Sequence, residues 1–323
     1  MKHFNKTEPK LQFYRFTDML AWLVRRVSFT EANVVAVERI EKYLNELEQE
    51  RAHHLSLDDQ VKNWPSRGKI EFDKLSARYA PGAPLVLNSV SATIPAGSKV
   101  GICGRTGAGK SSLTVALFRL IESDSGEIRI DGVKISDLGL SKLRSNIGII
   151  PQEPVLFTGT LRYNLDPNSK FTDAELWTML EKSHLKEFVK SNKLGLEMTI
   201  SEDGGNISVG QRQLICLTRA LLSKVSLPIY ALYKCYFKCK ILVLDEATAS
   251  VDIDTDRLIQ KTIRSEFSHA TTLTIAHRID TIEDSDLILV LDKGKVAEFA
   301  PPSELLKTGG IYASLVSESR KQS

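Results

Sequence analysis

Residues 104–112 read Gly104-Arg105-Thr106-Gly107-Ala108-Gly109-Lys110-Ser111-Ser112 and match the phosphate-loop pattern G-x-x-x-x-G-K-[ST] at every fixed position. Residues 99–103, just before it, are typical of a short buried strand, and residues 113–120 have helical spacing without a breaker. A strand, a glycine-rich turn and a helix are the context that this motif requires. A chance glycine turn followed by Lys-Ser is therefore the weaker interpretation.

The residue types of this loop suit a bound polyphosphate. Glycines let the backbone approach phosphate oxygens without a Cβ clash, and the first amides of the following helix point at the anion. We expect Lys110 to reach the β- and γ-phosphates and Ser111 to offer its hydroxyl to Mg²⁺.

The composition of the chain is that of an ordinary globular protein. Of its 323 residues, 42% are hydrophobic and 26% are charged, and the net charge of +3 predicts no strong field for nucleic acid or anionic lipid. No run reaches the ~18 apolar residues of a membrane span, and no secretory signal opens the chain. We interpret the four cysteines, Cys103, Cys216, Cys235 and Cys239, as free thiols in a reducing compartment.

The distribution of apolar residues divides the chain into three segments. Residues 1–50 contain a long helix, or two, whose apolar stripes find no partner within the segment. Residues 51–68 have the polar, proline- and glycine-containing composition of a linker, and residues 69–317 form the main domain. The leading helix either packs on that domain or is the end of something longer, and its start without a cap signal favours the second interpretation.

Polar residues at the ends of predicted strands complete a candidate site. One buried strand ends at Asp245 and Glu246, which we expect to hold Mg²⁺ and to polarise an attacking water. Gln152 and His277 also follow predicted strands, at the edge where open α/β sheets bind ligands. The alternatives are a pair of solvated acids and a structural histidine. Tyr79, at another strand end, either packs or stacks on a purine face.

A second helix start lies further along the chain. Ser208 is a natural N-cap for a helix that runs to about residue 222, and Val209, Gly210 and Gln211 form its first turn. One chain rarely folds two anion-binding helix ends onto one phosphate. We therefore expect this one to serve a nucleotide held by another domain.

Together these elements resemble the ATP-binding-cassette family, and closely the second nucleotide-binding domain of its C (multidrug-resistance-protein) subfamily of exporters. The resemblance covers residue 70 to the C-terminus with one interruption, and its motifs are very specific. Residues 104–112 match Walker A, residues 241–246 match Walker B, Gln152 matches the Q-loop, residues 207–211 match the signature, and residues 250–252 resemble the D-loop, His277 the switch histidine and Tyr79 the adenine-stacking aromatic.

The resemblance implies an α/β fold: a P-loop NTPase core with a mostly parallel sheet, an antiparallel β subdomain, a helical signature subdomain and an N-terminal helical extension. Residues 33–39 resemble the segment that follows the last membrane helix in that subfamily. The implied partners are transmembrane domains and a first nucleotide-binding domain of the same transporter, paired head to tail, with no nucleic acid. The implied location is the cytoplasmic face of a membrane.

The resemblance also implies roles for residues. The implied function is ATP hydrolysis that drives export, with ATP and Mg²⁺ as cofactors. Lys110, Glu246 and His277 would be catalytic. The metal would lie at Ser111, Gln152 and Asp245. The nucleotide would be bound by Tyr79, Gly104, Arg105, Thr106, Gly107, Ala108, Gly109, Lys110, Ser111, Ser112 and Gln152, and the ATP of the partner by Ser208, Val209, Gly210 and Gln211.

Two departures from the family pattern stand out. Val209 puts a branched side chain where the family signature has glycine, which in this subfamily goes with the site that hydrolyses slowly or not at all, whereas Glu246 keeps this chain's own site competent. Residues 225–239 form an apolar, aromatic insert that the family lacks, with Pro228 blocking extension of the helix. We interpret the insert as a translated intron or gene-model error; if it is real, it should bulge as a surface loop.

Two other functions compete with an exporter cassette. One is a soluble cassette ATPase of repair or translation, and the segment like a membrane-helix remnant argues against it. The other is an inactive or regulatory truncated cassette. The sequence gives no indication of the transported substrate, because exporters select it in membrane helices.

Overall fold

The computed structural model of the chain describes residues 8–47, 49–222, 239–245, 253–276 and 278–322. The chain divides into two compact units, residues 1–51 and 52–323. Within the described ranges, we find no helix that combines the length and the hydrophobicity of a membrane span. The predictions for Cys235, Glu246, residues 250–252, His277 and most of the insert lie outside the described residues.

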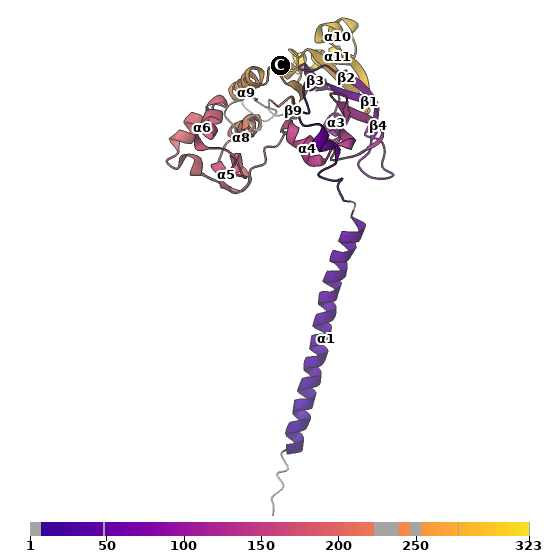
Figure 1. Cartoon of the computed structure of the whole chain (residues 1–323), viewed down its shortest axis with the longest axis vertical. Helices are drawn as coiled ribbons and strands as arrows, with labels where there is room; N and C mark the ends of the chain where they lie inside the picture. Colours follow the sequence, from indigo (N-terminus) through magenta and orange to yellow (C-terminus); the bar gives the residue numbers. More distant parts are fainter. Residues whose placement is uncertain (1–7, 48, 223–238, 246–252, 277, 323) are drawn as a thin grey trace, which may run out of the picture. The chain divides into compact units, whose positions relative to one another are not determined.

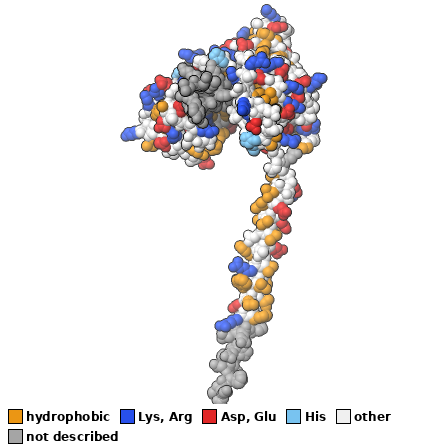
Figure 2. Space-filling model, in the orientation of Figure 1, with side chains coloured by type: hydrophobic (Ala, Val, Ile, Leu, Met, Phe, Trp, Pro, Cys, Tyr) orange, Lys and Arg blue, Asp and Glu red, His pale blue; other side chains and the backbone are white. Residues whose placement is uncertain are grey.

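The first unit is built on α1 (Glu8–Glu46), a single helix of 39 residues. Large hydrophobic side chains are exposed along it, among them Trp22 at 57% and Val27 at 59%, and Figure 2 shows them spread along the rod. The Arg26 guanidinium lies 5.4 Å from the centre of the Trp22 ring, which is a cation–π contact. The helix therefore keeps a wide apolar surface that its own unit does not cover.

A six-stranded sheet forms the centre of the second unit, in the order β12-β11-β3-β10-β9-β6. Five neighbouring strands are parallel, and β12 joins the edge antiparallel to β11. Ile241, Leu242 and Val243 of β9 are fully buried, as expected of a parallel strand that is covered on both faces. The strands are β3 (Lys99–Cys103), β6 (Ile147–Ile150), β9 (Ile241–Asp245), β10 (Thr271–Ile275), β11 (Leu287–Asp292) and β12 (Lys295–Ala300).

A second, antiparallel sheet has the order β2-β1-β4-β5. Its strands are β1 (Ile70–Ala77), β2 (Leu87–Ile94), β4 (Ser123–Ile130) and β5 (Val133–Lys134). β1 and β2 form a hairpin around residues 81–84, with Ile70 opposite Ile94 and Ala77 opposite Leu87. Side chains of this sheet share one hydrophobic core with the central sheet and with α3 (Lys110–Leu117).

The helical part of the second unit has a core of its own. In Figure 1, α5, α6 and α8 gather on the side away from β1, β2 and β4. Thr172 and Glu175 form the capping box that starts α6. The elements are α5 (Leu161–Leu165), α6 (Asp173–Lys182), α7 (Lys186–Ser191), α8 (Val209–Leu222), and the short strands β7 (Gly159–Thr160) and β8 (Thr199–Ile200).

The remaining helices surround the central sheet. α11 contributes Tyr312 and Val316 to a small core with Cys103 of β3 and Ala276 after β10. These helices are α2 (Leu57–Gln60), α4 (Leu140–Asn146), α9 (Ile253–Glu266), α10 (Pro302–Thr308) and α11 (Ile311–Gln322), with 3₁₀ turns at Ile135–Asp137, Gly195–Glu197, Glu202–Gly204 and Ile279–Thr281.

Part of the segment expected to be a linker is folded onto the second unit. Trp64 is 6% exposed and donates its indole N–H to Ile130 O at 2.9 Å. The Asp131 carboxylate accepts the backbone N–H groups of residues 66–69 at 2.7–3.0 Å. The boundary between the two units accordingly falls at Arg51, before this segment, and not at residue 68.

Candidate functional site

The phosphate loop joins β3 to α3 and is held from both sides. Gly104 has φ +148°, and a Cβ there would lie 2.2 Å from Leu291 O. Gly109, the N-cap of α3, has φ +100°, and a Cβ there would lie 2.9 Å from Val86 O. At Gly107, by contrast, no heavy atom lies within 4 Å of the Cβ position. The backbone is thus packed where it meets the domain and open at its tip, where a ligand can approach.

The two residues beside the tip are exposed, and the lysine is not. Arg105 and Thr106 are exposed, whereas Ala108 is 3% and Lys110 only 6% exposed. Lys110 Nζ donates to Gly104 O at 2.9 Å and to Arg105 O at 3.3 Å. The ammonium is therefore fixed inside the curve of the loop. Backbone N–H groups and a buried ammonium form a donor set that suits a polyphosphate.

The first turn of α3 connects the loop to Tyr79. Ser111 is exposed, and Ser112 is 7% exposed. The hydroxyls of Ser112 and Tyr79 share a hydrogen bond of 2.9 Å, although 33 residues separate them. Tyr79 is 57% exposed, so its ring is available for a further contact. The structure thus brings a free aromatic face next to the phosphate loop.

The register of the parallel strands brings further predicted residues to the same edge of the sheet. Ile102 of β3 pairs with Ile275 of β10, and Ile275 pairs with Asp245 at the end of β9. Ile150, at the end of β6, pairs with the residue before Asp245, and exposed Gln152 follows two residues later. The carboxyl ends of β6, β9, β10 and β3 are therefore neighbours, as expected for a ligand site in an open α/β sheet. Glu246 and His277 follow β9 and β10 in sequence but lie outside the described residues.

The signature residues belong to a different core from the phosphate loop. Ser208 N–H donates to Gln211 Oε1 at 3.0 Å, and Gln211 N–H donates to Ser208 Oγ at 3.2 Å. This reciprocal cap confirms Ser208 as the N-cap of α8. Val209 starts the helix and Gly210 is buried. α8 packs in the helical core, whereas α3 packs in the core of the two sheets.

The thiol of Cys103, which precedes the loop, is unreactive. Burial raises the pKa of Cys103 to about 12, and the nearby Glu298 carboxylate adds to the effect. A thiol with such a pKa stays protonated at neutral pH, so it is no nucleophile. In the described part of the chain, Cys103, Cys216 and Cys239 are not in disulfides.

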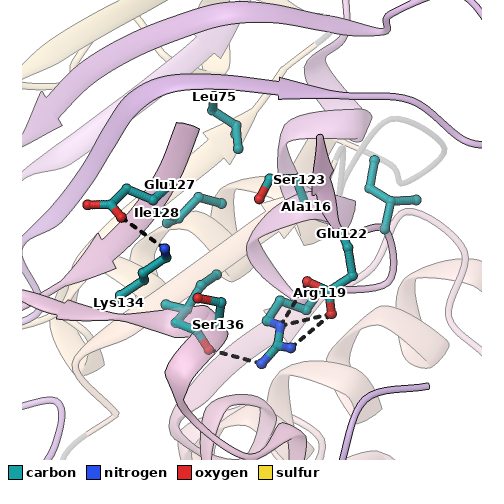
Figure 3. A pocket seen from close by; sticks show the side chains of 11 residues that line it. Leu75, Ala116, Arg119, Glu122, Ser123, Glu127, Ile128, Lys134 and Ser136 are labelled. Atoms are coloured by element: carbon teal, nitrogen blue, oxygen red, sulfur yellow. Dashed lines mark hydrogen bonds and ion pairs between the residues drawn. The ribbon is translucent and has the colours of Figure 1, made fainter. Parts of the chain in front are cut away.

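A small cavity of about 20 Å³ lies behind α3, on the side of the antiparallel sheet (Figure 3). Arg119, 6% exposed, donates to the Glu122 carboxylate at 2.9 Å and to Leu138 O at 2.7 Å. Glu127 forms an ion pair with Lys134, with 3.2 Å between the carboxylate oxygen and Nζ. These charged groups satisfy one another, which is the arrangement of a structural cluster rather than of a ligand site.

No motif in the sequence pointed to residues 155–164, which we call the coupling loop. Val155, Phe157 and Tyr163 are 50–59% exposed. Phe157 N–H donates to Asn164 Oδ1 at 2.8 Å, so the loop backbone is held in place while these three side chains are exposed. The signal in the sequence was an apolar run between Pro154 and Gly159 that fits neither a strand nor a helix period.

Comparisons with known proteins agree with this geometry. The ABC transporter family model matches residues 87–230, so that the match ends within the insert. ATP-binding cassette sub-family C member 3 of Homo sapiens is 50% identical over 92% of the chain, and sub-family C member 2 of Homo sapiens is 50% identical over 94%. Multidrug resistance protein mrp-7 of Caenorhabditis elegans is 49% identical over 95%.

The chain spans only 18–19% of the length of these curated relatives. Among solved structures, a bacterial Atm1-family ABC exporter with ATP bound is 30% identical, with a TM-score of 0.77 over 96% of this chain and 51% of that chain. The predicted fold class is confirmed by this likeness. The chain is a C-subfamily ABC transporter cassette, a domain of the kind that binds ATP.

Proposed function

We propose that this chain binds ATP and Mg²⁺ at the carboxyl edge of its central sheet and hydrolyses ATP in a head-to-tail pair with another cassette. One observation carries the proposal: strand register brings the phosphate loop, Asp245 and Gln152 to one edge. The shape and charge of the phosphate loop also suit a nucleotide, because the loop combines an open tip at Gly107 with a buried ammonium at Lys110.

Each residue has a distinct role at this edge. Lys110 binds the β- and γ-phosphates, and Tyr79 stacks on the adenine. Ser111, Gln152 and Asp245 hold Mg²⁺, which neutralises charge that develops on the phosphates. Glu246 orients and polarises the attacking water, and His277 faces the γ-phosphate. Positioning and charge stabilisation therefore account for most of the rate enhancement.

The signature of this chain acts on the ATP of its partner. Two observations support this role: α8 packs in a different hydrophobic core from α3, and the Ser208–Gln211 cap starts a helix whose N-terminus suits an anion. Val209 narrows the approach to that N-terminus. In the proposed pair, the site that receives this signature is the slower one, and the site built on Glu246 is the faster one.

The pair powers export through membrane domains, and the cassette lies on the cytoplasmic side. The coupling loop supports a membrane-domain partner, because Val155, Phe157 and Tyr163 offer apolar area on an ordered backbone. The exposed apolar side chains of α1 support the same assignment. The family model that matches is that of the ABC transporters, and the matching solved structure is an ABC exporter with ATP bound.

The variant Glu246→Gln tests the catalytic part. It removes the charge that polarises water but keeps the size of the side chain, so turnover should fall by about 10²–10⁴-fold while ATP affinity stays within about twofold. Phosphate release and ATP titration measure the two quantities. Glu304→Gln, an exposed change in α10, is the matched control. Unchanged hydrolysis in Glu246→Gln would remove this residue from its role. ATP binding without hydrolysis in the wild-type chain would favour a regulatory cassette.

A further inference from the structure

Arg219, near the end of α8, reaches across to the coupling loop. Its guanidinium donates to Asn164 O at 2.7 Å, to Val155 O at 2.8 Å and to Asn164 Oδ1 at 3.0 Å. These contacts join residues 55 and 64 positions apart in the sequence. One half-buried side chain thus holds both ends of the loop.

Asn164 organises the interior of the same loop. It is 2% exposed, and its Nδ2 donates to Phe157 O at 2.8 Å and to Thr160 O at 3.0 Å. Its Oδ1 accepts the Phe157 N–H and the Arg219 guanidinium. The loop backbone therefore wraps around one amide, and the amide is bound to α8.

α8 carries the signature at its other end. The helix axis between Ser208 and Arg219 spans roughly 16 Å at 1.5 Å per residue. A second tie from the same helix reaches the segment before the loop: Gln213 Nε2 donates to Gln152 O at 3.0 Å and to Pro151 O at 3.3 Å. The described contacts thus connect one helix to residues 151–164 at four backbone carbonyls and one side chain.

We propose that Arg219 and Asn164 are positioning residues that join the coupling loop to the signature helix, so that an element docked on Val155, Phe157 and Tyr163 moves the signature turn with it. The proposal rests on the proposed function, in which the signature acts on the ATP of a partner cassette. Neither residue touches that ATP. They transmit the position of the loop.

The chemistry of the pair explains why arginine is required. The planar fork presents several N–H donors in fixed directions, and three acceptors lie within its reach. Lysine keeps the charge but offers one small ammonium, which cannot hold Val155 O and both Asn164 oxygens in this geometry. Arg219→Lys therefore separates the geometry of the connection from its charge.

Hydrogen exchange of the whole 323-residue chain, followed by mass spectrometry, tests the connection. In Arg219→Lys we expect amides of the coupling loop and of residues 207–211 both to exchange about tenfold faster, which corresponds to about 1.4 kcal/mol. Arg162→Lys is the matched control, because Arg162 lies in α5 but bonds to Asp173 and Phe171 O and not to α8. The control should leave residues 207–211 unchanged.

Asn164→Ala provides a second variant if Arg219→Lys fails to fold. It removes the loop amide and one acceptor of Arg219, and it should also speed exchange in both segments. Faster exchange in the coupling loop alone, in whichever variant folds, overturns the proposal. An equal increase in amide exchange rate across the antiparallel sheet also overturns the proposal, because it indicates that the variant destabilises the whole unit.

Kinetics separate this proposal from the function on which it rests. Arg219→Lys should lower kcat of paired cassettes about tenfold and leave the Kd for ATP within about twofold, because the phosphate loop is untouched. If the wild-type chain does not bind ATP, the proposed function is wrong. A joint change in exchange of the coupling loop and residues 207–211 would still support the connection between them. Normal ATP binding with unlinked exchange would defeat only the inference.

Discussion

Replacing Gly104 by alanine is the sharpest perturbation of the phosphate loop. The new Cβ would lie 2.2 Å from Leu291 O, a backbone atom that no rotamer change can move, and the residue would keep φ near +148°. Backbone strain of this kind costs about 1–3 kcal/mol, and overpacking against fixed atoms costs about 1–3 kcal/mol more. The expected loss of unfolding free energy is therefore about 2–6 kcal/mol.

Gly107→Ala is the matched control in the same loop. Its φ is +79°, but no heavy atom lies within 4 Å of the new Cβ. Only the left-handed backbone contributes, at about 1–2 kcal/mol. Urea unfolding without nucleotide, followed by far-UV circular dichroism, measures both variants. The difference between them isolates the contact with Leu291 O.

Equal losses in the two variants would refute this reasoning. They would mean that the loop moves away from Leu291 at no cost, and that the close packing on one side does not hold it. A Gly104→Ala protein with the same unfolding free energy as the wild type would lead to the same conclusion. In that case the loop would not be pre-shaped before its ligand arrives.

Two further predictions concern Asp131 and Tyr79. Asp131 is partly buried, which by itself raises its pKa, but hydrogen bonds from four backbone amides outweigh this and lower the pKa below its usual 3.8. Its stabilising contribution is therefore present above pH 3.8 and lost as the pH falls through the lower folded pKa. Asp131→Asn should cost ~1 kcal/mol of unfolding free energy at pH 7 and progressively less as the pH falls below 3.8, as read from urea unfolding over a series of acid pH values. Tyr79→Phe, which keeps the ring and loses the hydroxyl bonded to Ser112, should bind ATP within about threefold of wild type, whereas Tyr79→Ala should lose about tenfold, and equal losses by calorimetry would argue against stacking.

Much of the fold could be predicted because local patterns carry it. Four consecutive apolar residues, 241–244, indicate a buried strand, and the turn at residues 81–84 indicates a hairpin, as observed. Thr172 followed by Glu175 encodes a cap within four residues of chain. Each of these features depends on neighbours in sequence.

Contacts between distant segments could not be predicted in this way. Trp64 and Pro65 have the composition of a linker, yet Trp64 is buried because Ile130 O, 66 residues away, accepts its indole N–H. Arg219 has the spacing of an ordinary helical residue, and nothing near it in sequence indicates that Asn164 lies within its reach. Periodicity predicts that a face is buried but not what covers it.

The predicted site residues depend both on local sequence and on contacts between distant segments. The motifs identified the phosphate loop and Asp245 from local residue types, whereas their common edge depends on the order β6-β9-β10-β3, a property of the whole sheet. The exposed ring of Tyr79 is adjacent to α3 only because β1 ends there. Residue types thus predicted the chemistry, and topology supplied the neighbourhood.

Calorimetric titration of Mg²⁺-ATP into the 323-residue chain and into Lys110→Ala tests the central claim most directly. Lys110 Nζ lies inside the curve of the loop, so its charge acts on any phosphate bound there. We predict one ATP site per chain and an affinity at least about tenfold weaker in Lys110→Ala, since a charge-assisted contact is lost. Equal affinities for the two proteins, or no binding by the wild-type chain, would contradict the claim that this loop holds the nucleotide.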